Sequence, residues 1–331
     1  MHRRQILSAV GGSCDNFPGM NRKLTLVAVG RGGWFNRADA RACGYTESEI
    51  RERLRVGRWR RLCRDGYVEV AAEPAAESPW ERAARLHRLT AVAVLYRMGG
   101  NAVVSHQSAL VLHRLPVWGL SLDRVHVTKP TGRWRSSAEL VVHRARIEPD
   151  HVVGAGELRV MSAARAAVEA ACGSSYEAAV VLFDTVLHQG VVSRADLEAL
   201  VRRLRHRTGS PRARNALAFA DGRSESVGES RLRTLMADYG LPTPDLQVEL
   251  FEHEEGGFIG RVDFLFRDLD VVVEFDGESK YANAGDLVAE KRREDRIRRI
   301  GYTVIRLAWA DLDRPVRTTR LIRDALLHAA A

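Results

Sequence analysis

The sequence has few cysteines, no paired metal-binding motif and no long apolar run, and each absence argues against a class of protein. Its four cysteines are Cys14, Cys43, Cys63 and Cys172. They are far apart and form no CxxC pair, which argues against a disulfide framework or a zinc knuckle. No apolar stretch approaches a membrane span, and the N-terminal run is too short and broken for a signal peptide. We therefore expect a soluble, cytoplasmic protein without a membrane partner.

Lysine is also scarce, because almost all of the 51 basic residues are arginines. The basic residues exceed the 42 acidic ones by 51 − 42 = 9. This surplus favours an anionic partner such as DNA, although a solvated basic surface would give the same composition. A length of 331 residues, 45% of them hydrophobic, predicts two or three packed domains of α/β class.

The first of these domains is expected at residues 24–72, after a disordered segment at 1–22. Asn36 can cap one helix, and Thr46 with Glu49 forms the capping box of a second. Asp65-Gly66 is a strong signal for a hairpin turn. Helix, turn, helix and hairpin together predict a winged helix-turn-helix that binds DNA. A winged helix used for protein contacts remains the alternative.

Arginines gather at the second helix and the hairpin, as phosphate contacts require. The residues expected to contact DNA here are Arg51, Arg53, Arg55, Arg58, Arg60 and Arg61.

Residues 76–206 are expected to form an α+β middle domain. The pattern predicts a helix over 79–98, strands over 125–128 and 140–143, and a helical segment that starts near residue 159. The domain's histidines include His106, His113, His126 and His143. They lack the paired spacing of a zinc site, so we expect ordinary packing or hydrogen-bonding roles for them.

Five short motifs in these two parts carry a resemblance to a known family. They are GWF at 33–35, GRWRRL at 57–62, VSHQSA at 104–109, LPVWG at 115–119 and RVHVT at 124–128. Their order resembles actinobacterial AbiEi-type proteins, the antitoxins and transcriptional autoregulators of type IV toxin–antitoxin systems. The resemblance covers roughly residues 24–200, and it implies a regulatory role and a cognate toxin as partner.

Residues 207–223 are rich in arginine, glycine and serine, and we expect a linker with one helical turn. Residues 224–331 predict a third domain in the order helix, three strands, helix, strand, helix. Acidic residues interrupt its apolar strands. Asp263 lies within one strand, and Glu274 and Asp276 end the next. A buried carboxylate without a partner costs several kcal/mol or more, so these acids need an explanation.

Glu229 lies in the first turn of the preceding helix, on the side expected to face the sheet. Glu229, Asp263 and Glu274 are therefore expected to converge on one face of the sheet. Gathered carboxylates repel each other, and oxygen ligands of this kind suit Mg²⁺ or Mn²⁺. The sequence predicts that these three acids are metal ligands.

This pattern resembles the PD-(D/E)XK nuclease superfamily. Within it, VVVEFDGESKY at 271–281 and RREDRIRRIGYTVIRL at 292–307 are similar to very-short-patch-repair endonucleases. The resemblance implies a restriction-endonuclease-like core and metal-dependent DNA cleavage, with Glu229, Asp263, Glu274 and Asp276 as site residues. The lysine that usually follows the second acid by two residues is Asp276 here, and Lys280 would hold the scissile phosphate instead. Arg292, Arg293 and Arg306 are expected to hold the DNA backbone.

Two functions follow from these observations. The acids favour a DNA endonuclease that the winged helix delivers to DNA. The AbiEi-like first two parts favour a non-catalytic transcriptional regulator or antitoxin with a degenerate nuclease fold.

Overall fold

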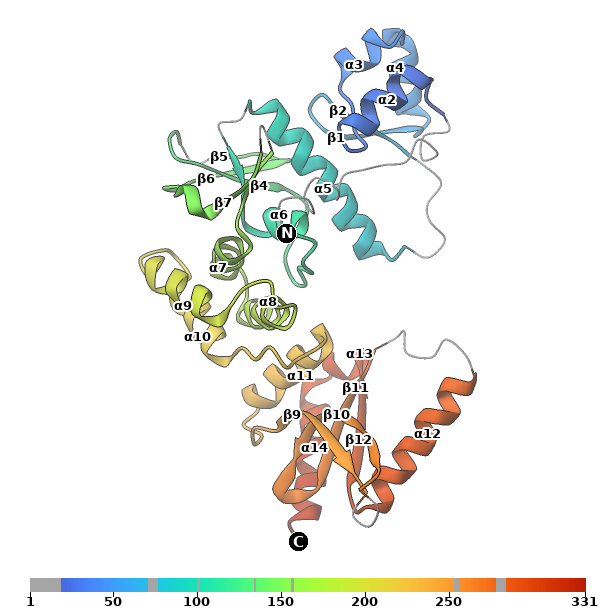
Figure 1. The fold of residues 1–331 in the computed structure, drawn as a ribbon, viewed down its shortest axis with the longest axis vertical. Helices are drawn as coiled ribbons and strands as arrows, with labels where there is room; N and C mark the ends of the chain where they lie inside the picture. Colours follow the sequence, from blue (N-terminus) through green and yellow to red (C-terminus); the bar gives the residue numbers. More distant parts are fainter. Residues whose placement is uncertain are drawn as a thin grey trace. The chain divides into compact units, whose positions relative to one another are not determined.

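The structure is a computed structural model that describes residues 19–70, 77–99, 102–133, 135–155, 158–252, 256–277 and 284–331. It is of mixed α/β class, with three separate sheets (Figure 1). The chain forms two compact units. One contains Met1–Ser174 and Ala195–Ser210, and the other contains Ser175–Arg194 and Pro211–Ala331. Within the described residues, no helix is both long and apolar enough to cross a membrane.

The first unit begins with three short helices and a β-hairpin. These elements are α2 (Arg22–Gly30), α3 (Arg37–Ala42), α4 (Glu47–Arg55), β1 (Trp59–Cys63) and β2 (Gly66–Glu69). The predicted capping by Asn36 and by the Thr46–Glu49 box is confirmed. Phe35, Ile50 and Trp59 are almost fully buried and join the helices to the hairpin.

Helix α2 begins at Arg22, with the Asn21 side chain accepting from the backbone N–H of Leu24. The expectation of disorder up to residue 22 is therefore wrong for its last residues, because Asn21 caps a helix. Residues 1–18 lie outside the described part of the chain.

A six-stranded sheet, ordered β5-β6-β4-β3-β8-β7, follows in the same unit. Its strands are β3 (Val103–Val104), β4 (Val125–Lys129), β5 (Arg135–Ser136), β6 (Leu140–Arg144), β7 (Val152–Ala155) and β8 (Leu158–Met161). The helices of this part are α5 (Pro79–Arg97), α6 (His106–Leu112), α7 (Ala163–Gly173) and α9 (Arg194–Arg203). The predicted helix over 79–98 and the strands over 125–128 and 140–143 are confirmed to within one residue.

The helical segment expected from residue 159 is wrong at its start, where Leu158–Met161 form strand β8. Val160 pairs with Val104 of β3 in a parallel ladder, and both side chains are fully buried. This long-range pairing decides the local structure, and the helix begins only after Ser162, which caps it.

The second unit contains a four-stranded sheet ordered β12-β11-β10-β9. Its strands are β9 (Asp245–Phe251), β10 (Phe258–Phe266), β11 (Val271–Asp276) and β12 (Thr303–Ala308). Its helices are α8 (Tyr176–His188), α10 (Ser210–Phe219), α11 (Val227–Asp238), α12 (Ala284–Arg299), α13 (Trp309–Leu312) and α14 (Pro315–Ala329). Two 3₁₀ turns, Pro149–His151 in the first unit and Arg267–Leu269 here, complete the elements described.

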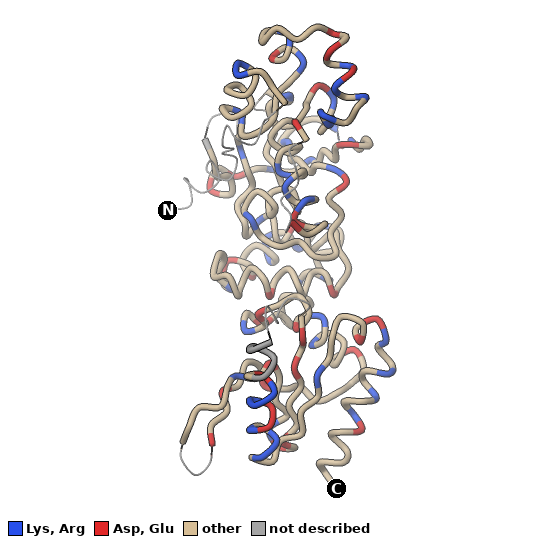
Figure 2. Tube along the Cα trace, turned by 90° about the vertical axis from the view of Figure 1, so that its right-hand side faces the viewer, with Lys and Arg blue, Asp and Glu red and all other residues tan. Residues whose placement is uncertain are grey.

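Alternate residues of β11 pack against different helices, as the period of a strand requires. Val271 and Val273 belong to a core with Leu232 of α11 and Ile322 of α14. Val272 packs instead with Ile297 of α12. The sheet therefore has α11 and α14 on one face and α12 on the other. Basic and acidic residues both lie along α12 (Figure 2).

The segment 207–223 contains the ten-residue helix α10, where the sequence indicated a linker. Its small apolar residues Ala213, Ala216 and Leu217 are buried at helical spacing, which a count of turn-forming residues does not detect. Helix α8 also belongs to the second unit. Asp184 of α8 forms a buried ion pair of 2.7 Å with Arg233 of α11. The second unit is thus larger than the expected third domain at 224–331.

Candidate functional site

The first acid of the candidate site, Glu229, lies in the first turn of helix α11 and is 6% exposed. Its backbone N–H donates to the side chain of Ser226, and its Oε2 accepts from the N–H of Glu225 over 3.0 Å. A Cβ on the preceding residue, Gly228, would lie 1.9 Å from a ring carbon of Phe275. The missing side chain lets α11 approach strand β11 closely, and this approach brings Glu229 to the sheet.

Asp263 and Glu274 lie opposite each other where strands β10 and β11 stop pairing. Phe264 pairs with Val273, and no paired residues lie beyond this point. Instead, the Oδ2 of Asp263 accepts from the backbone N–H of Phe275 over 2.8 Å. The carboxylate thus takes the place of a ladder hydrogen bond, which fixes its orientation at the end of the sheet.

Gln247 of strand β9 joins two of the acids, and the sequence reasoning missed it. Its Nε2 donates to the Oε2 of Glu229 over 2.9 Å and to the Oδ1 of Asp263 over 3.4 Å. The backbone of Gln247 has a φ of +54°, a left-handed conformation that side chains other than glycine's rarely adopt. Residues held in such a conformation cluster at functional sites. No pattern in the sequence marked this glutamine.

Glu274 is held by arginines from two other elements. Its Oε1 lies 2.6 Å from an Nη2 of Arg293 on α12, and its Oε2 lies 3.2 Å from Arg306 on β12. Arg306 also pairs with Asp276 over 3.3 Å. Both arginines contact Glu290 as well, and the hydrogen bond from Arg293 lowers the pKa of Glu290 to about 2.

The expectation that the three acids share one sheet face is therefore correct only in part. Glu274 alternates with Val273 and Phe275, so it lies on the face of α12, whereas Glu229 comes from α11 on the other face. Asp263 lies between them. Its charge raises the pKa of Glu229 after the larger effect of burial, and it also acts in the same direction on Glu274.

The electrostatics fit an oxygen-bound divalent cation better at Glu229 and Asp263 than at Glu274. Burial and the neighbouring Asp263 raise the pKa of Glu229, so its ionised form lacks compensating charge that a cation would supply. Burial also raises the pKa of Glu274, but Arg293 and Arg306 oppose that effect. A cation at Glu274 would have to compete with a guanidinium. Lys280 lies outside the described residues.

The expected DNA-binding arginines differ in how far they are already engaged. Arg53 lies over the rings of Tyr45 and Trp59 and donates to the carbonyl of Gly19. Arg55 forms a two-pronged ion pair with Glu52. Arg293 and Arg306 are held by the acids described above, whereas the remaining members are exposed. These are Arg51, Arg58, Arg60, Arg61 and Arg292.

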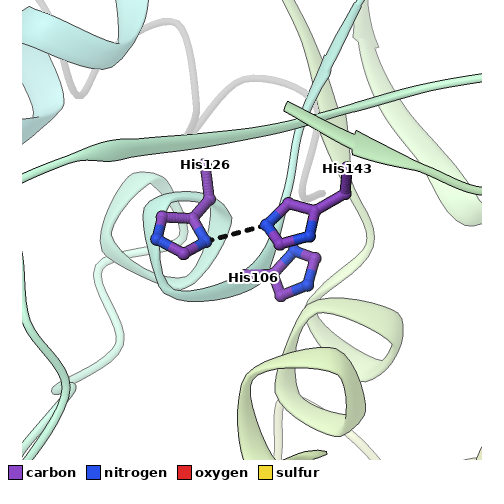
Figure 3. A group of neighbouring side chains, drawn as sticks. All are labelled: His106, His126 and His143. Carbon is purple, nitrogen blue, oxygen red and sulfur yellow. Dashed lines mark hydrogen bonds between the residues drawn. The ribbon is translucent and has the colours of Figure 1, made fainter. Parts of the chain in front are cut away.

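A second candidate site lies in the first unit, where spacing argued against one. His106, His126 and His143 come together, and one ring nitrogen of each lies within 4.8 Å of one ring nitrogen of the other two (Figure 3). Sequence spacing did not show this cluster, because its three members come from elements that are distant in sequence. His113 lies apart and bonds the carbonyl of Met161.

All three clustered imidazoles are uncharged at neutral pH. Burial lowers the pKa of His126 to about 3 and that of His143 to about 4, and it holds the pKa of His106 well below its usual range.

The chain is similar to two proteins of Mycobacterium tuberculosis. These are "Uncharacterized protein MT2308" of strain CDC 1551 / Oshkosh and "Uncharacterized protein Rv2248" of strain ATCC 25618 / H37Rv. Each is 32% identical over 237 residues, which cover 69% of this chain and 82% of the relative. No model of a known protein family matches the chain.

Proposed function

Since the chain belongs to the family of the mycobacterial proteins MT2308 and Rv2248, whose names assign no activity, we propose that it is a DNA-binding, metal-dependent endonuclease. The observation that carries the proposal is the arrangement of Glu229, Gln247 and Asp263. Two carboxylates from a helix and a strand share one amide, and the residue that supplies the amide has a strained backbone. Strain of this kind is maintained where a site requires a fixed geometry.

The proposed fold of the second unit is a PD-(D/E)XK nuclease core. Its support is the order of the elements. Helix α11 is followed by the three antiparallel strands β9 to β11, and helix α12 then leads to β12, which is parallel to β11. The proposed fold of residues 24–72 is a winged helix-turn-helix. It is supported by helices α3 and α4 and the hairpin of β1 and β2. An AbiEi-like middle domain completes the proposal.

In this proposal Glu229 and Asp263 would hold Mg²⁺ or Mn²⁺. Glu274 would join them only if the ion replaced its two arginines, Arg293 and Arg306. A bound divalent ion of this class supplies a nucleophilic hydroxide from water and neutralises phosphate charge. Gln247 orients the two carboxylates toward each other. Asp276 and Lys280 complete the proposed site, and Lys280 would stabilise the charge that develops on the phosphate.

The arginines have two proposed roles. Arg58, Arg60 and Arg61 on the hairpin, with Arg51 on α4, would contact phosphates and deliver the chain to DNA, because exposed arginines bind phosphate oxygens well. Arg293 and Arg306, once released from Glu274, would face the scissile phosphate. Arg292 would contact the flanking backbone.

A second function, that of a non-catalytic regulator or an antitoxin with a cognate toxin, is favoured by one observation. Glu274 is already neutralised by Arg293 and Arg306, so a stable nuclease-like fold needs no ion at this acid. Under this reading the acids and arginines are structural, and the chain binds DNA without cutting it.

DNA cleavage by the purified chain distinguishes the two functions. Supercoiled, linear and single-stranded DNA would be incubated with Mg²⁺ or Mn²⁺, and with EDTA as the blank. We expect nicking or linearisation that needs the ion and is lost in Asp263→Ala. Asp268→Ala is the matched control, because Asp268 is an exposed acid that follows the same strand. Absence of cleavage with both ions, in a chain that still binds DNA, would establish the regulator.

A further inference from the structure

The three clustered histidines come from two strands of the six-stranded sheet, β4 and β6, and from helix α6 (Figure 3). Strands β4 and β6 are parallel neighbours, and His126 pairs with Val141 whereas His143 pairs with Thr128. The two histidines are therefore two residues apart in register and point to the same face of the sheet. The Nδ1 of His126 lies 3.0 Å from the Nε2 of His143.

His106 supplies the third ring from the first residue of helix α6. Its imidazole lies against that of His143, with the ring centroids 3.8 Å apart. The backbone of His106 has a φ of +53°, a left-handed conformation that residues other than glycine rarely adopt. A strained backbone that places a third imidazole beside two others indicates a constraint on the position of this ring.

Three imidazole nitrogens are the donor set that Zn²⁺ and similar ions accept, with metal–nitrogen distances of about 2.0–2.1 Å. Tetrahedral ligands at that distance lie about 3.3 Å from one another. The pair formed by His126 and His143 is already near this spacing. A lone pair lies in the plane of its ring, so His106 would have to turn out of its stack to complete the set.

The surroundings contain an acid, Glu169, whose Oε1 accepts hydrogen bonds from Arg165 and Arg207. Glu169 is 1% exposed, and its Oε2 accepts no hydrogen bond. This oxygen lies 3.6 Å from the Nδ1 of His106. Arg207 lies 3.0 Å from the Nε2 of His106, and the hydroxyl of Ser105 lies 3.0 Å from its Nδ1. The turn of the ring would therefore exchange the contact with Ser105 for the ion. Glu169 thus places one carboxylate oxygen beside the Nδ1 of His106, while its other oxygen is paired with the two arginines.

A cavity of about 510 Å³ gives access to the cluster within the first unit. His143 forms part of its wall, together with Arg144, Arg203 and Arg207. An ion held by His143 would have its remaining coordination position toward this cavity, whose lining is mostly arginine with one acid, Glu148. Water or a small anion suits that position.

We infer that His106, His126 and His143 bind a divalent transition-metal ion of the Zn²⁺ class, with one position open to the arginine-lined cavity. Binding moves the proton of His126 from Nδ1 to Nε2. To accept this proton, the side-chain amide of Gln107, now 3.1 Å from that Nε2, would turn its oxygen toward it and give up its hydrogen bond to the carbonyl of Ser121. This site is separate from the carboxylates of the second unit and does not depend on the proposed nuclease activity.

Cobalt is the probe, because tetrahedral Co²⁺ absorbs visible light whereas octahedral Co²⁺ on oxygen ligands absorbs only weakly. The chain would be freed of metal and titrated with Co²⁺, and the Asp263→Ala chain would be titrated in parallel. We expect one equivalent with a visible band in both chains, and Zn²⁺ should abolish the band. His126→Asn and His143→Gln keep a polar atom near the position of the coordinating nitrogen. Both variants should lose the visible band.

His113→Gln is the matched control, because its amide can still reach the carbonyl of Met161 and the variant should retain the band. X-ray absorption at the zinc edge of the wild-type chain needs no variant and should detect imidazole nitrogens. The inference is overturned if the wild type takes up no stoichiometric Co²⁺ or Zn²⁺. It is also overturned if His126→Asn and His143→Gln retain the band, or if the zinc ligands are not imidazoles.

Discussion

Gln247 donates a hydrogen bond of 2.9 Å to the Oε2 of Glu229, a residue 18 positions earlier in the chain. The same amide nitrogen lies 3.4 Å from Asp263, so one uncharged group moderates the repulsion between two acids. A cation bound between the two carboxylates would relieve the same repulsion. The glutamine therefore links the stability of the metal-free chain to the proposed ion site.

Replacing Gln247 tests this link through a pair of variants. Gln247→Ala removes the amide and keeps the backbone strain, so we expect it to lower the free energy of unfolding by about 1–3 kcal/mol. Gln247→Gly also removes the amide but relieves the positive φ, and it should be more stable than the alanine variant by about 1 kcal/mol. Urea denaturation in EDTA measures both. Equal stability of the two variants would show that the φ of Gln247 costs nothing.

Glu229→Gln should stabilise the metal-free chain at neutral pH. The folded pKa of Glu229 is raised, so the folded state holds a proton more tightly than the unfolded state does. Stability is therefore lost as the pH rises from the unfolded pKa, about 4.5, through the folded one. The glutamine variant lacks this loss. Thermal unfolding in EDTA should show an advantage for the variant at pH 7 that disappears near pH 4, and an advantage that is independent of pH would contradict the assignment.

Acid should destabilise the histidine cluster. The folded pKa values of His126 and His143, about 3 and about 4, lie below the unfolded value of about 6.5. Their contribution is present above pH 6.5 and is lost as the pH falls toward the folded values. Each histidine adds a slope of about 1.4 kcal/mol per pH unit within that window. Urea denaturation between pH 7 and 4.5 measures the free energy of unfolding as a function of pH. His126→Asn should show a shallower dependence on pH than the wild type, and an unchanged dependence would refute the burial effect.

DNA binding by the hairpin should depend on its exposed arginines. Arg58→Ala combined with Arg60→Ala should weaken binding and reduce the slope of log K against log salt by about 2, since two phosphate contacts are lost. Arg55→Ala is the comparison, because Arg55 is already paired with Glu52 and should matter less. Fluorescence anisotropy of labelled duplex DNA at several salt concentrations measures both slopes. An identical slope in the double variant would remove these residues from the interface.

Much of the secondary structure could be predicted, because local signals and the final contacts agree. The Thr46–Glu49 box starts α4 as expected, and the apolar runs of β11 and β12 form strands where the sequence predicts strands. Strand β8 could not be predicted, because its identity depends on pairing with β3, more than 50 residues earlier. Helix α10 was hidden by arginine, glycine and serine around a short buried stripe.

The candidate sites were also predictable to different degrees, because some of their residues carry a local signal in the sequence and others depend on long-range contacts. The acids Asp263 and Glu274 stand out because charge in an apolar strand is conspicuous. Gln247 does not stand out, because an uncharged residue in a strand signals nothing until its backbone conformation is known. The clustering of His106, His126 and His143 depends on the order of β3, β4 and β6 in the sheet, which sequence spacing does not contain.

The measurement that tests the central claim most directly is the effect of Mn²⁺ on the melting temperature of the wild-type chain and of Asp263→Ala. Binding to the native state alone raises the melting temperature, by an amount that grows with ion concentration. We expect a rise in the wild type that is absent in Asp263→Ala. Each chain is compared with its own metal-free baseline, because the variant also loses the acceptor of the Phe275 N–H and should melt lower without metal. A wild type that does not respond to Mn²⁺, or a variant that responds equally, would contradict a metal site at these carboxylates.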